Sequence, residues 1–367
     1  MRTRRDLVFV SAGLGLDGGG RALAGRLLAG ACAAFAAERE ASFRVLSLDG
    51  GRTPGLESSE DSSRGFGGDQ RALALSLWKG QMAGRRAAYV FDLLGPARVQ
   101  SYLPAPFRAP YLVPLYGIEV WRPLDWDRRR ALAMATVRFA ISAHTLERAR
   151  PFCPDLRGTP VLPLALEERE PSGEIDPLLL DRLGNGFFLI AGRMASGERY
   201  KGHDQILAAW PGLLAVHPAA RLVIAGDGDD RPRLAEKAAS LGLAGAVSFT
   251  GFTSEATLAE LYRRCAAFVM PSRGEGFGLV YLEAMRAARP VLAARGSAAE
   301  EIVRDGETGL LVDPDDRREL TAALGRLLGE PEAARRMGAA GREHWRREFG
   351  IERFRERLRP LLDRLIG

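Results

Sequence analysis

Cysteine and histidine are scarce in this sequence, and the few that occur do not cluster. None of the three cysteines and four histidines stands at the short spacing of a zinc site, so the sequence predicts no metal centre of that kind. An odd, sparse set of cysteines also excludes a disulfide-stapled scaffold and predicts a reduced, cytosolic protein. These residues are Cys32, Cys153, Cys265, His144, His203, His217 and His344.

Long apolar runs are lacking as well. No stretch approaches the roughly 20 apolar residues that are needed to cross a bilayer. The N-terminus loosely imitates a signal peptide, because three arginines at 2–5 precede an apolar stretch at 7–16. Asp6, Asp17 and the glycines at 18–20 interrupt this stretch, which favours a buried first strand that runs into a glycine loop.

Charge of one sign is not concentrated in either half of the chain. The formal net charge is +6; residues 1–182 contain 25 basic and 21 acidic residues, and the remainder contains 27 and 25. The sequence has no long basic run of the kind that binds nucleic acid, so we expect no nucleic-acid partner. The mild basic excess would instead favour a peripheral contact with an anionic membrane surface.

Short apolar runs alternate with longer amphipathic ones, a pattern typical of parallel α/β sheets. Because 367 residues exceed what one hydrophobic core usually holds, we expect two domains. Helices are predicted near 21–37 and 127–134 and between the strands of the second half. The predicted strands are 7–11, 43–48, 87–91, 111–115, 137–141, 160–162, 187–191, 221–225, 247–250, 267–270, 291–293 and 310–312.

Composition sets the predicted boundaries. The stretch 50–68 is rich in glycine, serine and aspartate and is predicted to be a loop. The charged, proline-containing segment 167–186 ends in Gly-Asn-Gly and is predicted to be a linker. We therefore expect a Rossmann-like domain at 1–166, a linker at 167–186, a second Rossmann-like domain at 187–348 and a C-terminal helix at 349–367.

The most informative stretch is 274–285, Gly-Glu-Gly-Phe-Gly-Leu-Val-Tyr-Leu-Glu-Ala-Met. It follows a predicted strand and opens a helix near Gly278. Glycines there let backbone N–H groups approach a ligand, and a helix N-terminus favours an anion. Glu275 and Glu283 have seven residues between them, and this arrangement resembles the family-four glycosyltransferases, which are retaining enzymes of the GT-B fold.

A second stretch supports the resemblance. Ala191-Gly192-Arg193 is followed by Arg199-Tyr200-Lys201-Gly202-His203-Asp204. In the family, the arginine and lysine of this arrangement grip the nucleotide diphosphate, which implies that role for Arg193 and Lys201. A departing diphosphate gains charge as the glycosidic bond breaks, so fixed cations stabilise it. The structural alternative is two solvated cations beside a glycine turn.

Three further segments resemble the family: 223–228 its glycine turn, 249–252 the segment that lines the nucleobase, and 306–312 a characteristic turn and strand. The resemblance implies that Glu283 binds the ribose hydroxyls and that Glu275 contacts the sugar and the charge developing at its anomeric carbon. Arg193, Lys201 and Glu275 are thus the implied catalytic residues. The implied donor-binding residues are Gly18, Gly19, Gly20, Gly251, Phe252, Gly276, Phe277, Gly278, Leu279 and Glu283.

The first half resembles the family less specifically. Gly18, Gly19 and Gly20 resemble the glycine loop that faces the donor phosphates, and 116–121 resembles a family segment that often begins with histidine. Here Tyr116 stands in place of that histidine, and Leu93 occupies another position that is often histidine. The acceptor-side chemistry is therefore open, with Tyr116 and Glu119 as its polar candidates and a capping or surface role as the alternative for Glu119.

Two other motifs compete with this interpretation. The glycines of 13–18 satisfy the dinucleotide-binding pattern, but that pattern needs an acidic residue about 20 positions on, and Asp49 comes 31 positions after Gly18. An NAD-dependent oxidoreductase is therefore a remote alternative. Asp227-Gly228-Asp229 imitates the metal-binding Asp-x-Asp of another glycosyltransferase fold, but the resemblance implies no metal there, and solvated carboxylates are the preferred interpretation.

The resemblance implies a GT-B architecture, with two Rossmann-like domains whose parallel sheets face across a cleft and a C-terminal helix that returns to the first domain. It implies a UDP- or GDP-linked sugar as co-substrate, no cofactor and no metal. The acceptor would be a glycan or a lipid-linked glycan of cell-surface polysaccharide or lipopolysaccharide assembly, reached from the cytoplasm or the inner membrane face. A non-catalytic subunit that binds sugar nucleotides is the alternative, because the two family histidines are missing.

Overall fold

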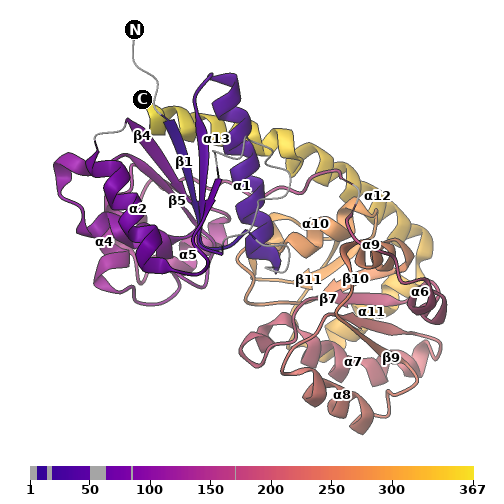
Figure 1. The fold of residues 1–367 in the computed structure, drawn as a ribbon. Helices are drawn as coiled ribbons and strands as arrows, with labels where there is room; N and C mark the ends of the chain where they lie inside the picture. The colour runs from indigo at the N-terminus through magenta and orange to yellow at the C-terminus, as the bar shows by residue number, and fades with distance from the viewer. Residues whose placement is uncertain (1–5, 15–18, 50–62, 84–85, 170) are drawn as a thin grey trace. The chain divides into compact units, whose positions relative to one another are not determined.

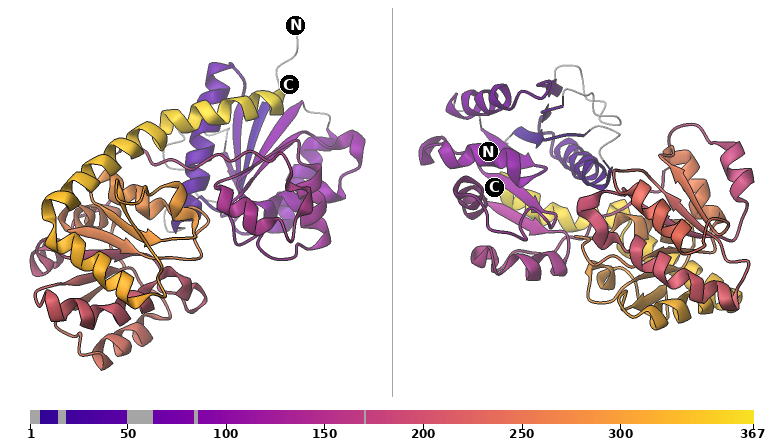
Figure 2. Two further views of the ribbon diagram at one scale, coloured as in Figure 1. Left: turned by 180° about the vertical axis from the view of Figure 1, so that it is seen from behind. Right: turned by 90° about the horizontal axis from the view of Figure 1, so that it is seen from below.

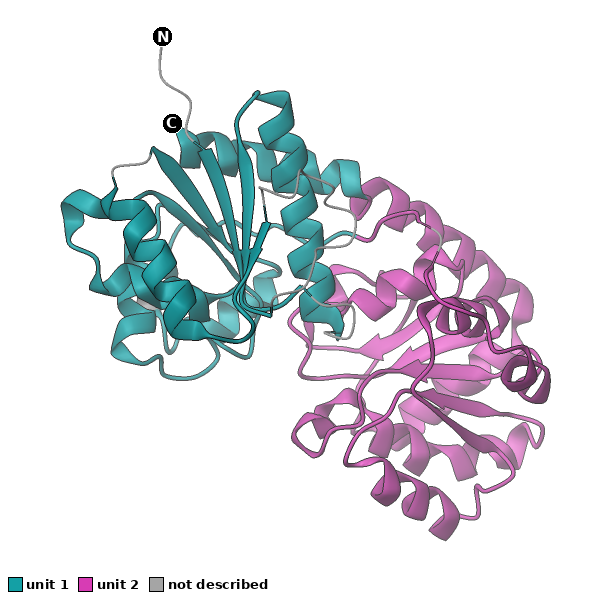
Figure 3. Cartoon of the chain, viewed as in Figure 1, with its two compact units in different colours: residues 1–165, 351–367 teal, residues 166–350 magenta. Residues whose placement is uncertain are grey.

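The chain folds into two compact α/β units. The computed structural model describes residues 6–14, 19–49, 63–83, 86–169 and 171–367. Unit 1 comprises Met1–Ala165 together with Ile351–Gly367, and unit 2 comprises Leu166–Gly350 (Figure 3). Within the described ranges, none of the helices combines the length and the hydropathy that a membrane-spanning helix requires.

Unit 1 is built on a parallel sheet of six strands in the order β3-β2-β1-β4-β5-β6 (Figure 1). Every residue of β4 and β5 is buried, because helices cover both faces of the sheet, and such strands appear in the sequence as unbroken apolar runs. The strands are β1 (Asp6–Ser11), β2 (Phe43–Ser47), β3 (Ser63–Gly65), β4 (Ala87–Phe91), β5 (Tyr111–Leu115) and β6 (Val137–Ala140).

The helices of unit 1 come from both ends of the chain. The last helix, α13 (Ile351–Ile366), buries an apolar stripe against α1 and β6 (Figure 2). Its Asp363 also pairs with Arg39. The other helical segments are α1 (Gly19–Glu38), α2 (Gln70–Met82), α3 (Leu94–Ala97), η3 (Arg98–Tyr102), η4 (Ala105–Phe107), α4 (Trp126–Met134), α5 (Ala143–Ala149) and η5 (Pro154–Leu156).

Unit 2 contains a second parallel sheet of six strands, in the order β12-β11-β10-β7-β8-β9. The strands are β7 (Phe188–Ala191), β8 (Leu222–Ala225), β9 (Val247–Gly251), β10 (Ala267–Met270), β11 (Val291–Ala294) and β12 (Gly309–Val312). The helical segments are α6 (Pro177–Leu183), η6 (Ser196–Lys201), α7 (His203–Val216), α8 (Arg231–Ser240), α9 (Glu255–Arg264), α10 (Leu279–Arg286), η7 (Ala298–Glu301), α11 (Arg317–Gly329) and α12 (Pro331–Glu348).

Both sheets follow the same strand order, since numbering each unit from its own first strand gives 3-2-1-4-5-6. This is the doubly wound Rossmann order, in which ligands bind outside the carboxyl ends of the strands where the order reverses. The reversal lies between β1 and β4 in unit 1 and between β7 and β10 in unit 2. The prediction of two Rossmann-like domains is confirmed.

Three local predictions need correction. The predicted strand 160–162 is reduced to a single bridge between Val161 and Ala140. The predicted loop 50–68, of which 50–62 lies outside the described residues, contains β3 at its end. The predicted linker 167–186 belongs to unit 2 and contains α6, because Leu179, Leu180 and Leu183 are buried there and Asp176 caps the helix.

Candidate active site

The loops after β7 and β10 meet at the point in unit 2 where the strand order reverses. The Lys201 ammonium, at the end of η6, lies 3.3 Å from Glu275 Oε1, in the loop between β10 and α10. A Cβ atom at Gly192, directly after β7, would lie 3.7 Å from Lys201 Nζ. Two residues 74 positions apart in the sequence are thus brought together over the sheet edge where a doubly wound fold binds its ligand.

The same two loops interlock through their backbones. Arg273 N–H donates to the Tyr200 carbonyl at 3.0 Å. The Tyr200 ring covers Gly274 so closely that a Cβ there would come within 2.4 Å of it, and Gly202 packs in the same way against Pro271. These close approaches fix the position from which Lys201 extends.

Arg193 and Lys201 converge on one carboxylate. The guanidinium of Arg193 pairs with Glu198 Oε1, and Lys201 Nζ lies 3.6 Å from Glu198 Oε2. Burial acts in the opposite direction, but the Arg193 hydrogen bond and the Lys201 charge lower the pKa of Glu198 below its ordinary value. Two cations from separate turns therefore already surround an anionic group at this position.

The loop after β10 ends in the N-terminus of α10. Gly278 occupies the capping position with φ of 101°, and the helix begins without a side-chain cap. A Cβ at Gly278 would come within 2.4 Å of the Tyr281 ring, so only glycine fits there. Phe277, Gly278 and Leu279 are buried and Gly276 is half-buried, so the N-terminus of α10 lies beneath the half-buried Glu275.

Glu283 lies on α10, one turn inside the helix, and faces α9. Tyr262 O–H donates to Glu283 Oε2 at 2.8 Å. Burial raises the pKa of Glu283, an effect that the Tyr262 hydrogen bond partly offsets. The Tyr262 hydrogen bond thus holds this half-buried carboxyl in a fixed orientation.

Gly251 and Phe252 lie at the carboxyl end of β9, an edge strand of the same sheet. Gly251 has φ of 73°, and Phe252 is 79% exposed, an unusual position for a large aromatic side chain. An exposed ring beside a ligand-binding sheet edge offers a flat apolar surface on which a base could rest.

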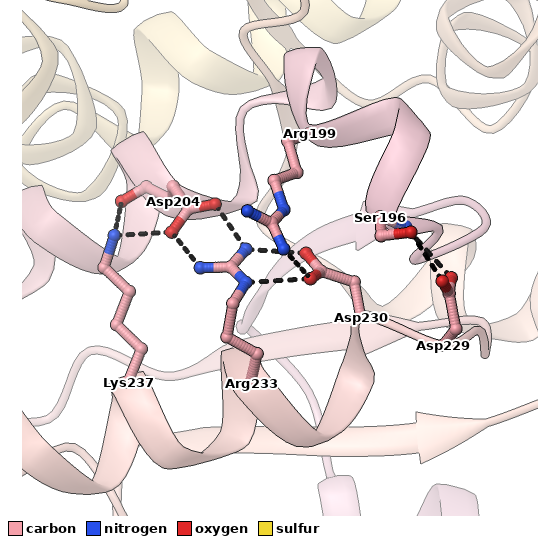
Figure 4. Close-up of polar contacts among 7 residues, drawn as sticks. All are labelled: Ser196, Arg199, Asp204, Asp229, Asp230, Arg233 and Lys237. Atoms are coloured by element: carbon pink, nitrogen blue, oxygen red, sulfur yellow. Dashed lines mark hydrogen bonds and ion pairs between the residues drawn. The ribbon is translucent and has the colours of Figure 1, made fainter.

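A network of ion pairs fastens η6 to α7 and α8 (Figure 4). Arg233 bonds both oxygens of Asp204, at 2.9 and 2.7 Å, and both oxygens of buried Asp230, at 2.8 and 2.6 Å. Arg199 Nη2 donates to Asp230 at 2.9 Å, and Lys237 Nζ donates to Asp204 at 2.6 Å. The Arg233 hydrogen bonds are the largest cause of the low pKa of Asp204, so the network stays ionised near neutral pH.

The turn at 226–230 is packed against the turn that carries Arg193. Cβ atoms at Gly226 and Gly228 would come within 2.1 Å of the carbonyl oxygens of Gly192 and Met194, so neither position can hold a larger residue. Asp229 accepts hydrogen bonds from Ser196 N–H at 2.9 Å and from Ser196 Oγ at 2.6 Å. Asp227 and Asp229 are both exposed, as expected of solvated carboxylates, and Asp229 in addition holds η6 through Ser196.

In unit 1, two acidic side chains hold the loop after β1. Ser11 Oγ and the Ala12 N–H both donate to Asp92 Oδ2, at 2.5 and 3.0 Å, and Leu14 N–H donates to Asp49 at 3.0 Å. Asp49 follows β2, where a dinucleotide-binding fold carries its acidic residue, but here its carboxylate binds the loop itself. Gly19 and Gly20 begin α1, and Gly18 lies outside the described residues.

The acceptor-side candidates lie after β5 in unit 1. Tyr116 N–H donates to Glu119 Oε1, and the N–H groups of Gly117 and Glu119 itself also stabilise this carboxylate. Burial nevertheless raises the pKa of Glu119, and it raises that of the Tyr116 hydroxyl, which Asp92 and Glu119 raise further. Glu119 thus supports its own turn. Leu93 follows β4 and precedes α3.

Four residues that hold these sites together lie outside the predicted motifs: Glu198, Tyr262, Arg233 and Asp92. Arg233 and Asp230 lie next to a recognised glycine turn, so a search for charged residues in the first turns of α7 and α8 could have found them. Glu198 and Tyr262 become visible only when separate elements are brought together.

Comparison with known proteins finds one family that resembles part of the chain. Residues 183–344 match the family described as Glycosyl transferases group 1. The chain is 40% identical over 152 residues to a GDP-mannose-dependent alpha-(1-6)-phosphatidylinositol monomannoside mannosyltransferase of Mycolicibacterium smegmatis, a match that covers 40% of each chain. It is 38% identical over 165 residues to a D-inositol 3-phosphate glycosyltransferase of Thermobifida fusca, covering 42% of this chain and 37% of that one. The alignments thus span less than half the length of these relatives.

Solved structures resemble the whole chain in fold. HepE of Anabaena, crystallised with UDP, superposes with a TM-score of 0.77 at 18% identity and covers 98% of this chain and 99% of its own. A sucrose-phosphate synthase of Thermosynechococcus elongatus gives 0.77 at 21% identity with the same coverage. The GT-B fold class is confirmed, and residues 183–344 match the group 1 glycosyl transferases, the family-four enzymes that the motifs of this chain resemble.

Proposed function

We propose that this chain is a retaining glycosyltransferase that transfers a sugar from a nucleoside-diphosphate sugar to a hydroxyl of a glycan or glycolipid. The observation that carries the proposal is the convergence of Arg193 and Lys201 on the Glu198 carboxylate, directly beside Glu275. A diphosphate that takes the place of this carboxylate would meet both cations and the N-terminus of α10. Such fixed charges stabilise a leaving group best when they need not reorganise.

The proposed reaction is a front-face displacement. The bond between the anomeric carbon and the diphosphate oxygen breaks, and the acceptor oxygen forms the new bond on the same face of the sugar. The acceptor proton passes to an oxygen of the departing phosphate, so no protein nucleophile is required. Glu275 would stabilise the positive charge on the anomeric carbon, and Glu283 would hold the ribose.

The donor and acceptor classes follow from the relatives. HepE was crystallised with UDP, and the mycobacterial relative is named for GDP-mannose and a phosphatidylinositol mannoside. We therefore propose a UDP- or GDP-linked sugar and a glycan or lipid-linked acceptor of cell-surface assembly, reached at the cytoplasmic face of the membrane. A non-catalytic subunit that binds the sugar nucleotide is the second candidate, since Leu93 and Tyr116 stand where relatives often carry histidine.

A thermal-shift screen across UDP-, GDP- and ADP-sugars, followed by hydrolysis and transfer assays on each hit, tests the proposal. Lys201→Met should lower the transfer rate by about two to three orders of magnitude, because one preorganised cation is lost. Lys201→Arg is the matched control that keeps the charge, and its loss should be smaller. Full activity of Lys201→Met would contradict the diphosphate assignment.

We further propose that transfer needs no divalent cation, because cationic side chains would neutralise the diphosphate. Activity should therefore persist in excess EDTA. Activity that disappears in EDTA and returns with magnesium or manganese would assign a metal to this site and overturn this part of the proposal.

A further inference from the structure

Glu198 is the carboxylate that the two cations of the candidate site share. The Arg193 guanidinium pairs with Glu198 Oε1, and Lys201 Nζ lies 3.6 Å from Glu198 Oε2. The carboxylate of Glu275 lies beside the same ammonium, at 3.3 Å, but has no such link to Arg193. A diphosphate that binds both cations must therefore displace the Glu198 carboxylate or bear its repulsion at close range.

Segment η6 is held on both sides of Glu198 by other residues. The N–H and Oγ of Ser196 donate to Asp229 at 2.9 and 2.6 Å, and Arg199 Nη2 donates to Asp230 at 2.9 Å (Figure 4). Glu198 itself stands at the kink of η6, where the backbone is not helical. Loss of the Glu198 charge would therefore leave the anchors of η6 in place.

Lys201 also has contacts that hold it without Glu198. The Arg273 N–H donates at 3.0 Å to the carbonyl of Tyr200, the residue that precedes Lys201. The ammonium lies 0.3 Å closer to Glu275 than to Glu198, since the two distances are 3.3 and 3.6 Å. The Glu198 carboxylate is thus not required to position the ammonium, and a second role for it is open.

The shared carboxylate is charged and less exposed than one of its cations. The Arg193 side chain is 64% exposed, whereas those of Glu198 and Lys201 are 18% and 15% exposed. Although burial opposes the shift, the Arg193 hydrogen bond and the Lys201 charge lower the pKa of Glu198, so it is ionised near neutral pH. An incoming anion therefore finds Arg193 accessible but meets a negative charge at Lys201.

We propose that Glu198 competes with the diphosphate for Arg193 and Lys201 and thereby speeds the release of the nucleoside diphosphate product. This inference rests on the proposed function and adds a role for Glu198 after transfer. When the bond between the anomeric carbon and the phosphate oxygen breaks, that phosphate takes up the acceptor proton. It then loses the proton to solvent, because a terminal phosphate has a second pKa of about 6. The product thus carries one more negative charge than the donor, and a neighbouring carboxylate repels it more strongly.

Calorimetry without acceptor tests the inference, with UDP, GDP and ADP as products and UDP-glucose, GDP-mannose and ADP-glucose as donors. Glu198→Gln keeps the size of the side chain and removes its charge. The variant should bind the product about three- to tenfold more tightly than the wild type, since two partly exposed ion pairs no longer compete. Its affinity for the matching donor should rise by a smaller factor, and stopped-flow dissociation of the product should slow.

Glu168→Gln is the matched control, because Glu168 also pairs with two arginines of unit 2, Arg342 at 3.7 Å and Arg346 at 2.9 Å. This variant should bind donor and product like the wild type. In Lys201→Met, the gain in product affinity from Glu198→Gln should shrink, because one of the two shared cations is absent. An undiminished gain in that background would place the effect outside this cluster and overturn the inference.

Weaker product binding by Glu198→Gln, the result expected if Glu198 positions the cations, would also overturn the inference. An equal gain in affinity for donor and product would do the same. Both results leave the proposed function standing, because the nucleotide still binds. A wild type that binds none of the three nucleoside diphosphates would contradict the proposed function and the inference together. Glu198→Ser, which also removes the charge, supplies the same measurements if circular dichroism shows that Glu198→Gln is misfolded.

Discussion

Two buried ionisable side chains, one in each unit, respond to pH in opposite directions. Burial raises the pKa of Asp92 to about 7, although the hydrogen bonds from Ser11 and Ala12 oppose this shift. Burial, reinforced by the Lys201 charge, lowers the pKa of His203 to about 4. Asp92 therefore holds a proton in the native state at pH values where the unfolded chain has lost it, and His203 lacks one at pH values where the unfolded chain has gained it.

The Asp92 contribution can be isolated with Asp92→Asn. An unfolded aspartate titrates near pH 4, so between about pH 4 and 7 the native state binds more protons than the unfolded state. The free energy of unfolding should therefore fall as the pH rises through this window, by no more than about 1.4 kcal/mol per pH unit. Asparagine does not titrate, so chemical denaturation from pH 5 to 8 should give a flatter profile for the variant.

The His203 effect has the opposite sign but is common to both proteins, so it cancels in the difference between the two profiles. Parallel profiles for the wild type and Asp92→Asn would show that Asp92 remains ionised in the folded protein. That result would contradict the role of a protonatable carboxyl in holding the loop after β1.

At the scale of the element, η6 carries Lys201 but has little structure of its own. It is a short 3₁₀ segment with a kink at Glu198, and none of its residues is buried. Its position depends on Arg199, on Ser196 and on the Arg233 network that ties α7 to α8. Ion pairs and hydrogen bonds thus hold η6 in position, whereas hydrophobic burial holds the strands.

We expect Arg233→Met to impair the site at a distance. The substitution keeps the apolar stem but removes four hydrogen bonds to Asp204 and Asp230, so Lys201 should lose its fixed position. Transfer should fall about 10- to 100-fold, since small misplacements of a catalytic group are costly, while the free energy of unfolding falls by about 1–3 kcal/mol. Steady-state kinetics and chemical denaturation measure the two effects.

Arg326→Met is the matched control, because Arg326 pairs with Glu330 on the surface of α11 and has no link to η6. Arg233→Lys should restore only part of the activity, because an ammonium cannot bond two carboxylates bidentately. Wild-type kinetics for Arg233→Met would mean that η6 holds its position without the network.

The strands were the easiest elements to predict. Strands such as β4 and β10 are buried along their whole length, so each stands out as an apolar run between polar stretches. Strand β3, Ser-Arg-Gly, is an exposed edge strand and has no such signal. Helix α6 was missed because prolines and charges surround a short apolar face whose burial depends on α9.

Residues of the candidate site could be proposed from the sequence where they belong to a local motif, and not where their position depends on packing. Glycines 226, 228 and 278 indicate close backbone approach in the sequence itself. Lys201 and Glu275 indicate charged groups in the same way. Glu198 and Tyr262 are recognisable as partners only once distant segments meet.

At the scale of the molecule, the chain repeats one topology without repeating its sequence. Each unit presents the carboxyl ends of its strands at a reversal of strand order, but the two edges carry different chemistry. In unit 2 the loops after β7 and β10 bring together Arg193, Lys201 and Glu275. In unit 1 the loop after β1 is held by Asp92 and Asp49, and a helix from the far end of the chain, α13, completes the core.

The central claim is that unit 2 binds a nucleoside diphosphate through one glutamate and activates its sugar through another. Calorimetry with the bare nucleoside diphosphate, alongside transfer assays, tests it most directly in Glu283→Ala, Glu275→Ala and the exposed control Glu332→Ala. Glu283→Ala should weaken nucleotide binding by roughly 1.5–3 kcal/mol for each charge-assisted hydrogen bond lost. Glu275→Ala should leave this affinity nearly intact while turnover falls sharply, as for an interaction made mainly in the transition state. Equal losses of nucleotide affinity in both variants, or tight binding by the wild type without turnover on any acceptor, would contradict the account.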